Sequence, residues 1–375
     1  MGKIQEKKKV EKGRKNKMQK RKVNIKEKGI TLVALVVTII IILILAGITI
    51  NMIVGENGII RSAQEAKNTW ENAIADDQEE LNSLIAELDE ELTDRSRDIY
   101  VFLYDDGTLT FSNTSEPVEG KNVLKAYGDI KGQEYTYEVG EDGSSITVNT
   151  PWAADVGTIT KVKILDEIKP TSTACWFANC NQLTEITGIE NFNTSNVTDM
   201  KYMFAYCSSL TNLDLKSFNT NDVTDMACMF YYCQNLESLD VSEFVTNNVT
   251  NMRGIFDFCR TLTTIDVSNF DTSKVTDMAY MFAYMYEVTE IKGLENFDTS
   301  SATTMECMFT ACQSLSSLDI SSFNTSNVTN MRGMFYGSSN LTTIYVGNGW
   351  TTQNVTNSED MFYNCGTSDV TLKTT

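Results

Sequence analysis

The chain has no histidine among its 375 residues, and it lacks several patterns that mark enzymes. Histidine is the commonest general base, so its absence removes the Ser/His and Cys/His arrangements of nucleophilic catalysis. Neither a glycine-rich phosphate loop nor a nucleophile elbow occurs in the sequence. The sequence therefore predicts a protein that is not an enzyme and that uses no cofactor.

Proline and cysteine are missing from long parts of the chain. All three prolines lie between Pro117 and Pro170, and none follows. No cysteine precedes Cys175, which argues against a lipid-modified cysteine near the N-terminus. The proline limit fits a change of structure close to residue 171.

Basic residues are scarce outside the first segment. The chain carries 31 Lys and Arg against 50 Asp and Glu, but residues 1–28 hold 13 Lys and Arg and only three Glu. A basic arm could bind nucleic-acid phosphates. The adjoining apolar run instead favours a cytoplasmic tail held inside by its positive charge. We therefore expect no nucleic-acid partner.

Residues 30–54 contain no charged side chain. A helix of this length spans about 37 Å at ~1.5 Å per residue, which exceeds a hydrocarbon core of ~30 Å. The run is longer than the apolar part of a secretion signal, about 7–15 residues, and no convincing small-residue cleavage site follows it. We expect a single membrane span in contact with lipid, with residues 1–29 as a cytoplasmic leader and the C-terminal part on the cell surface.

The boundary "KEKGITLVALVV" resembles the N-terminus of type IV prepilins. The resemblance implies that a prepilin peptidase is a partner, which cuts between Gly29 and Ile30 and methylates the new N-terminus. Ala34 stands where that family usually has Glu, a residue that aids subunit docking, so the departure bears on filament assembly. An uncut anchor and a removed signal are the alternatives.

Residues 55–98 have apolar residues at helical spacing and an acidic opposite face. This amphipathic helix would contact either a partner subunit or its own domain.

In residues 99–170 apolar and polar side chains alternate instead, and "IYVFLYDDGTLTFSN" and "YTYEVGEDGSSITVN" each predict a β-hairpin. We expect a β-rich cap domain here, because the end of a repeat array has to be covered.

Residues 171–375 are built from repeats. "FNTSNVTDMKYMFAYC" at Phe192 recurs in related form, and "CWFANC" is a partial first copy. The later copies start at Phe218, Phe244, Phe270, Phe297, Phe323 and Trp350. The 26-residue period, longer by one position at the steps to Phe297 and Trp350, predicts a solenoid of about eight coils in which each coil is buried by its neighbours.

A single copy predicts the structure of a coil. Leu213 and Leu215 alternate with polar residues, which is typical of a short strand, with Leu210 and Phe218 also pointing inward. Val223, Met226, Phe230 and Cys233 follow at spacings of three and four, which predicts a short helix capped by Thr224. The expected fold class is therefore an α/β solenoid of the leucine-rich-repeat type.

The 26-residue pattern resembles the BspA-like leucine-rich-repeat surface proteins of bacteria. The resemblance implies a protein that is displayed on the cell surface and binds a protein or polysaccharide in adhesion. A pilin-like structural subunit of a pilus or secretion pseudopilus is the alternative. The side chains expected to face a partner are exposed helix positions rich in Tyr and Arg, because these residues dominate binding hot spots. They are Tyr202, Tyr231, Tyr232, Arg253, Tyr280, Arg332 and Tyr336.

Two columns of repeated residues resemble metal sites. Six of the nine cysteines share one repeat position, which Met285 and Ser338 fill in other copies, so buried thiols are favoured over disulfides or metal ligands. Asp214, Asp240 and Asp266 share a strand position on successive coils. Stacked carboxylates can bind a cation such as calcium, but hydrogen bonds to the backbone or to solvent also stabilise them.

Overall fold

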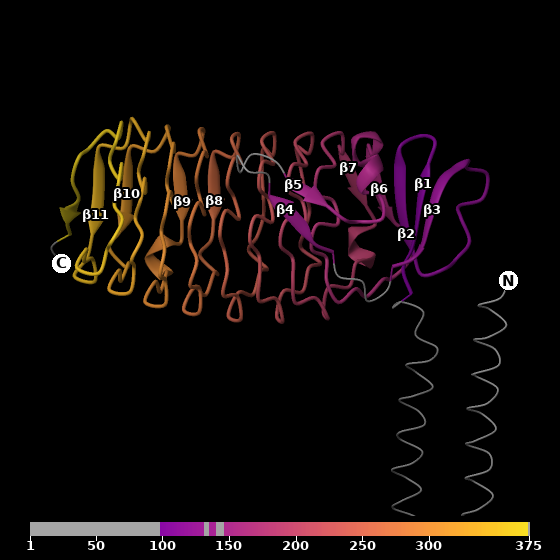
Figure 1. Ribbon diagram of the computed structural model, residues 1–375, viewed down its shortest axis with the longest axis horizontal. Helices are drawn as coiled ribbons and strands as arrows, with labels where there is room; N and C mark the ends of the chain where they lie inside the picture. The colour runs from indigo at the N-terminus through magenta and orange to yellow at the C-terminus, as the bar shows by residue number, and fades with distance from the viewer. Residues whose placement is uncertain (1–97, 131–134, 140–145, 374–375) are drawn as a thin grey trace, which may run out of the picture. The chain divides into compact units, whose positions relative to one another are not determined.

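The computed structural model describes residues 98–130, 135–139 and 146–373 (Figure 1). They lie within one unit of the chain, Asp94–Thr375. The leader, the apolar segment 30–54 and nearly all of the amphipathic segment fall outside the described residues, so the interpretations given for them stay predictions. Within the described ranges, no helix has the length and apolar character that crossing a membrane requires.

The described chain begins with a β-hairpin. Strands β1 (Tyr100–Tyr104) and β2 (Thr108–Ser112) pair antiparallel. Gly107 closes the turn with a φ of +78°, and Asp106 accepts a hydrogen bond from the backbone N–H of Thr108 at 3.0 Å. The first predicted hairpin is confirmed.

The second predicted pairing is also confirmed. β4 (Tyr137–Val139) runs antiparallel to β5 (Ile146–Val148), and the residues that join them lie outside those described. The pair packs on the first coils of the solenoid: the Asn179 side chain donates to the Ile146 carbonyl at 2.8 Å.

The β-rich segment and the solenoid share one sheet. Its strand order is β3 (Val123–Asp129), β1, β2, β6 (Lys161–Ile164) and β7 (Glu185–Thr187). β2, β6 and β7 are parallel, whereas β1 pairs antiparallel with both of its neighbours. The 3-10 helix η2 (Ala153–Thr158) precedes β6. The sheet of the β-rich segment thus continues directly into the strands of the coils.

Aromatic side chains close this end of the solenoid core. Trp152 is fully buried and donates its indole N–H to the Trp176 carbonyl at 2.8 Å. Phe111 stacks on Trp176 with ring centroids 5.1 Å apart. The residues before the repeats therefore cover the first coil, as a solenoid core requires.

The coils lie side by side in a row (Figure 1) and pair through short parallel strands. β8 pairs with β9, and β10, β11 and β12 form a three-stranded sheet. The remaining elements are β8 (Thr264–Asp266), β9 (Glu290–Lys292), β10 (Ser317–Ile320), β11 (Thr343–Val346), β12 (Thr371–Leu372), η3 (Ile189–Asn191) and η4 (Leu294–Asn296).

The core follows the repeat. Leu210, Leu213, Leu215 and Phe218 are all buried, as predicted. One phenylalanine per coil forms a continuous stack, with neighbouring centroids 5.4–6.0 Å apart. Its members are Phe177, Phe204, Phe230, Phe256, Phe282, Phe309, Phe335 and Phe362. These eight positions correspond to about eight coils.

The predicted helix of each coil is wrong. In residues 226–233, alternate backbone N–H groups bond to the next coil: Cys228 N–H donates to the Arg253 carbonyl at 2.7 Å, and Phe230 N–H to the Ile255 carbonyl at 3.1 Å. Other N–H groups of this segment donate three residues back and close β-turns. The backbone groups that an α-helix needs are thus used between coils. The fold is a β-solenoid rather than an α/β solenoid.

Thr224 is not a helix cap either, and the neighbouring Asp225 stabilises a turn. The Thr224 hydroxyl donates to the Thr198 carbonyl of the preceding coil at 3.2 Å. The Asp225 carboxylate accepts from the backbone N–H of Ala227 at 2.9 Å, which stabilises the turn. Both residues serve the stacking and turning of coils.

Candidate binding surface

Each coil contains two turns with a left-handed residue, and together these turns form one side of the solenoid. Their φ values lie between 53° and 69° in all eight coils. The first column is Cys175, Tyr202, Cys228, Gly254, Tyr280, Cys307, Gly333 and Asp360; the second is Asn179, Tyr206, Tyr232, Phe258, Tyr284, Ala311, Gly337 and Asn364. We call the side formed by these residues and their neighbours in the same turns the turn face. All seven predicted partner-binding residues belong to it.

Tyr202 is not available to a partner, so the prediction that it is exposed is wrong. Only 8% of its surface is exposed, and the Tyr137 ring of β4 lies 4.1 Å from its own ring. Burial raises the pKa of the Tyr202 hydroxyl. The β4–β5 pair covers this position.

Three predicted residues are linked across successive coils. The Arg253 guanidinium lies 4.8 Å from the Tyr280 ring centroid. The Tyr280 hydroxyl donates to the Glu306 carboxylate at 3.5 Å, and Arg332 pairs with the same carboxylate at 3.3 Å. Arg253 also pairs with an Asp277 carboxylate oxygen at 3.6 Å. The charges of both arginines are thus balanced within the turn face.

Tyr336 lies at a separate place on the turn face. It is 39% exposed and stacks on Tyr363 in the next coil, with ring centroids 5.3 Å apart. Tyr363 is 61% exposed. Tyr336 and Tyr363 therefore form an aromatic pair with a large solvent-exposed surface.

Tyr231 and Tyr232 are half-buried and belong to a larger aromatic cluster. Tyr206, Tyr232, Phe258 and Tyr284, which we call the aromatic ladder, stack from coil to coil at 5.1, 5.0 and 4.2 Å. Tyr231 contacts the ladder edge-on, 5.1 Å from Tyr206. The ladder lies along the turn face.

Sequence reasoning missed three members of the ladder. Tyr206, Phe258 and Tyr284 occupy the same repeat position as Tyr232, one residue before the cysteine or methionine that ends the turn. A comparison of this one position across the copies would have found them. Within the ladder, Tyr232 and Phe258 each lie between two other rings.

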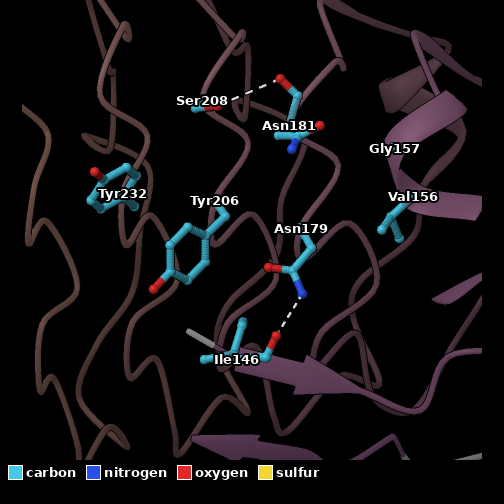
Figure 2. A pocket seen from close by; sticks show the side chains of 8 residues that line it. All are labelled: Ile146, Val156, Gly157, Asn179, Asn181, Tyr206, Ser208 and Tyr232. Atoms are coloured by element: carbon cyan, nitrogen blue, oxygen red, sulfur yellow. Dashed lines mark hydrogen bonds between the residues drawn. The ribbon is translucent and has the colours of Figure 1, made fainter. Parts of the chain in front are cut away.

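A hollow of about 450 Å³ lies where the ladder meets the β-rich segment (Figure 2). Tyr206, Tyr232, Asn179 and Asn181 line it from the coils, and Ile146 lines it from β5. Its volume is in the about 300–1,000 Å³ range of small-molecule sites. Its lining side chains are all uncharged.

The stacked aspartates of the strands are stabilised by the backbone. Asp214, Asp240 and Asp266 each accept a hydrogen bond from the backbone N–H two residues further on, at 3.0–3.1 Å. Hydrogen bonds from the side chains of Ser242 and Ser268, together with those from their backbone N–H groups, hold the pKa of Asp240 and Asp266 below the usual value. In the part of the chain that the structure describes, no group of three or more acidic or cysteine side chains is placed to hold a metal ion.

The cysteines are free thiols, and seven of the nine are buried. The thiol of Cys207 donates to the Phe177 carbonyl of the preceding coil at 3.1 Å, and Cys233 donates to the Phe204 carbonyl at 3.2 Å. Ser338 makes the equivalent bond, to Phe309, through its hydroxyl. The column therefore joins coils by hydrogen bonds, as the substitution of Ser for Cys suggests.

The solved structures that are similar to this chain include two bacterial leucine-rich repeat proteins. The protein from Bacteroides ovatus ATCC 8483 is 16% identical, with a TM-score of 0.29, over 60% of this chain and 75% of its own. The protein from Eubacterium ventriosum ATCC 27560 is 13% identical, with a TM-score of 0.28, over 72% of this chain and 94% of its own. No curated protein matches the chain.

A family model matches the repeats twice, over residues 171–290 and 256–374. The two matches together span more than half of the chain and coincide with the coils of the solenoid. The chain therefore belongs to the family described as "Mycoplasma protein of unknown function, DUF285".

Proposed function

We propose that the chain is a non-catalytic binding module that docks a protein partner on its turn face. The observation that carries this proposal is the aromatic ladder with its neighbouring arginines. Tyrosine and arginine are enriched among the few residues that dominate binding energy. A solenoid side built from repeated positions offers a long, regular surface for such a partner.

The stacking in the ladder favours a protein over a polysaccharide. A sugar ring packs on an open aromatic face, but Tyr232 and Phe258 each lie between two other ladder rings and also contact the Arg260 guanidinium. Ring edges and hydroxyl groups are then what the ladder presents. Burial raises the pKa of Tyr231 and Tyr280, so that their hydroxyls stay protonated as hydrogen-bond donors.

We further propose that the module is displayed outside the cell on the span at residues 30–54. This proposal rests on the uncharged run and its basic flank alone. Cleavage at Gly29 by a prepilin peptidase is part of the same proposal. We do not extend it to a pilus subunit, because Ala34 replaces the Glu that aids docking in filaments.

A cell-binding assay with the full-length protein tests the docking proposal. Four turn-face residues are changed to Ser together: Arg253, Tyr280, Arg332 and Tyr336. The matched control changes four exposed residues outside the turn face to Ser: Lys161, Lys216, Lys292 and Tyr345. We expect saturable binding that weakens by at least about tenfold in the turn-face variant and little in the control.

Protease treatment of the target cells separates the partner classes. Binding that disappears after this treatment supports a protein partner, and binding that survives it points to a polysaccharide. Equal binding by both quadruple variants would move the interface away from the turn face. No saturable binding by the unmodified protein would count against a binding module.

A further inference from the structure

Arg260 stands apart from the other arginines of the described residues. Arg253 pairs with a carboxylate oxygen of Asp277 at 3.6 Å, and Arg332 pairs with Glu306 and with Glu359. Arg260 has no carboxylate partner among the described residues. In a chain with 50 acidic and 31 basic side chains, an arginine without such a partner is unexpected.

Aromatic rings hold Arg260 in place instead. Its guanidinium carbon lies 5.4 Å from the Tyr232 ring centroid, 5.1 Å from that of Phe258 and 5.3 Å from that of Tyr286. All three distances are within the ~6 Å limit of a cation–π contact. Three such contacts restrict the long side chain before any ligand arrives, which lowers the entropy that binding would cost.

The guanidinium keeps hydrogen-bonding capacity in this position. Its Nε is inaccessible to solvent and has no acceptor among the described residues. The terminal nitrogens are therefore the donors that a ligand can reach. A planar guanidinium whose donors are unused matches a carboxylate, which accepts two of its N–H bonds side by side.

We propose that Arg260 and the rings around it form a docking site for an acidic side chain of a protein partner. The proposal rests on the proposed function, since it supplies the charge chemistry of the same turn face. The rings would pack against apolar atoms beside the carboxylate, and the guanidinium would donate hydrogen bonds to its oxygens.

A single acidic side chain fits this site better than a polyanion. The chain carries a formal net charge of −19, and the exposed Glu237 and Glu287 lie on the coils before and after that of Arg260. A sulfated polysaccharide brings negative charge at every few ångströms and would be repelled by them. A single carboxylate instead pairs with the one unpaired guanidinium and brings little additional negative charge.

NMR of the full-length protein with 15N-labelled arginine tests the site directly. The probe is the peptide acetyl-Phe-Glu-Glu-Phe-amide, and acetyl-Phe-Gln-Gln-Phe-amide is its uncharged match. The Nε signal of Arg260 is assigned by its absence in Arg260→Lys. We expect millimolar Glu peptide to shift this signal, and the shift to be at least about tenfold smaller with the Gln peptide.

Arg253 and Arg332 are the internal controls, because their guanidinium groups are already paired. Their signals should move much less than that of Arg260. No movement of the Arg260 signal, or equal movement with both peptides, overturns the proposal. Movement with dextran sulfate but not with the Glu peptide also overturns it, in favour of a polyanion. None of these outcomes depends on the cell-binding assay, so the two proposals fail separately.

Discussion

At the scale of the residue, the cysteine column shows how one small side chain can serve two purposes in a stack of coils. Cys233 is fully buried and donates its thiol to the Phe204 carbonyl at 3.2 Å. Burial raises the pKa of this thiol to about 12, so that it stays protonated and able to donate. The side chain therefore fills space and also adds a second hydrogen bond to the Phe204 carbonyl, which already accepts one from the Cys207 backbone N–H at 3.0 Å.

Replacement of Cys233 by Ala should lower the free energy of unfolding by about 0.5–1.5 kcal/mol, because one buried hydrogen bond to the Phe204 carbonyl is lost. Cys233→Ser is the matched control. It should lose less, because Ser338 makes the same kind of bond to the Phe309 carbonyl of the preceding coil at 2.7 Å. Urea unfolding of both variants measures the difference. An equal loss in the two variants would mean that packing, and not the hydrogen bond, is what the thiol contributes.

Asp257 carries a buried carboxyl group at a position that other coils fill differently. It is 6% exposed, and its Oδ1 has no hydrogen-bond donor among the described residues. Burial raises its pKa well above the usual value, although the Arg253 charge opposes this. The equivalent residue of the next coil is Ala283.

Asp257→Ala should therefore stabilise the protein near neutral pH, by about 1–3 kcal/mol. Because the folded-state pKa lies above the unfolded one, protonation favours the folded protein. The protonated Asp257 contributes stability below the unfolded pKa, and this contribution is lost as the pH rises through the folded pKa. The gain from the substitution should then shrink on acidification. Thermal unfolding at several pH values measures it, and a gain that does not depend on pH would contradict this account.

At the scale of the element, the paired turns require backbone conformations that most residues disfavour. Gly254 and Gly333 both have φ of +58°, and an added Cβ at either would lie 3.1 Å from a cysteine sulfur of the preceding coil. Gly337 has a similar φ of +69°, but its nearest neighbour would be 3.8 Å away. These glycines separate the effect of backbone conformation from that of crowding.

Gly254→Ala should thus cost more stability than Gly337→Ala. Both variants incur the left-handed penalty of roughly 1–2 kcal/mol, but only the first crowds the Cys228 sulfur. The added cost should be about 1 kcal/mol, at the lower end of values for overpacking. Denaturant unfolding of both variants checks this, and adding Cys228→Ala to Gly254→Ala should recover part of the loss. Equal costs for the two glycines would show that the sulfur moves aside freely.

The turns also show why the sequence predicted the coils correctly but wrongly predicted a helix in the second half of each coil. The 26-residue period and the inward Leu213 and Leu215 follow from the repeat itself. Spacings of three and four at Val223, Met226 and Phe230 suit a helix. Two consecutive turns give the same spacings, and the hydrogen bonds that decide between them join one coil to the next, as from Cys228 to Arg253. Local periodicity contains no sign of those bonds.

The candidate surface was predicted in part for the same reason. The turn-face location of Arg332 and Tyr336 could be read from the variable repeat positions. The burial of Tyr202 could not, because the ring that covers it belongs to Tyr137, far earlier in the sequence. The unpaired state of Arg260 depends on three rings from different coils and also required the structure.

At the scale of the whole molecule, the proposed span at residues 30–54 would determine where the solenoid is displayed. Co-expression with a prepilin peptidase should remove the leader up to and including Gly29 and leave an N-methylated Ile30. Gly29→Phe should block the cut, while the apolar run from Ile30 to Val54 still holds the protein in the membrane. Intact mass spectrometry of the membrane fraction measures both. A mature protein that keeps its whole leader beside an active peptidase would contradict the prepilin resemblance.

The solenoid itself should fold without the N-terminal segment. The phenylalanine stack runs from Phe177 to Phe362, and Trp152 and Trp176 close its first end, so the core is covered by residues of Asp94–Thr375. This fragment should be soluble, melt cooperatively and give a circular dichroism spectrum without strong helical features. Phe256→Ala should lower its free energy of unfolding by about 3–5 kcal/mol, because it opens a cavity in the middle of the stack. Aggregation of the unmodified fragment, or a predominantly helical spectrum, would count against a self-sufficient β-solenoid.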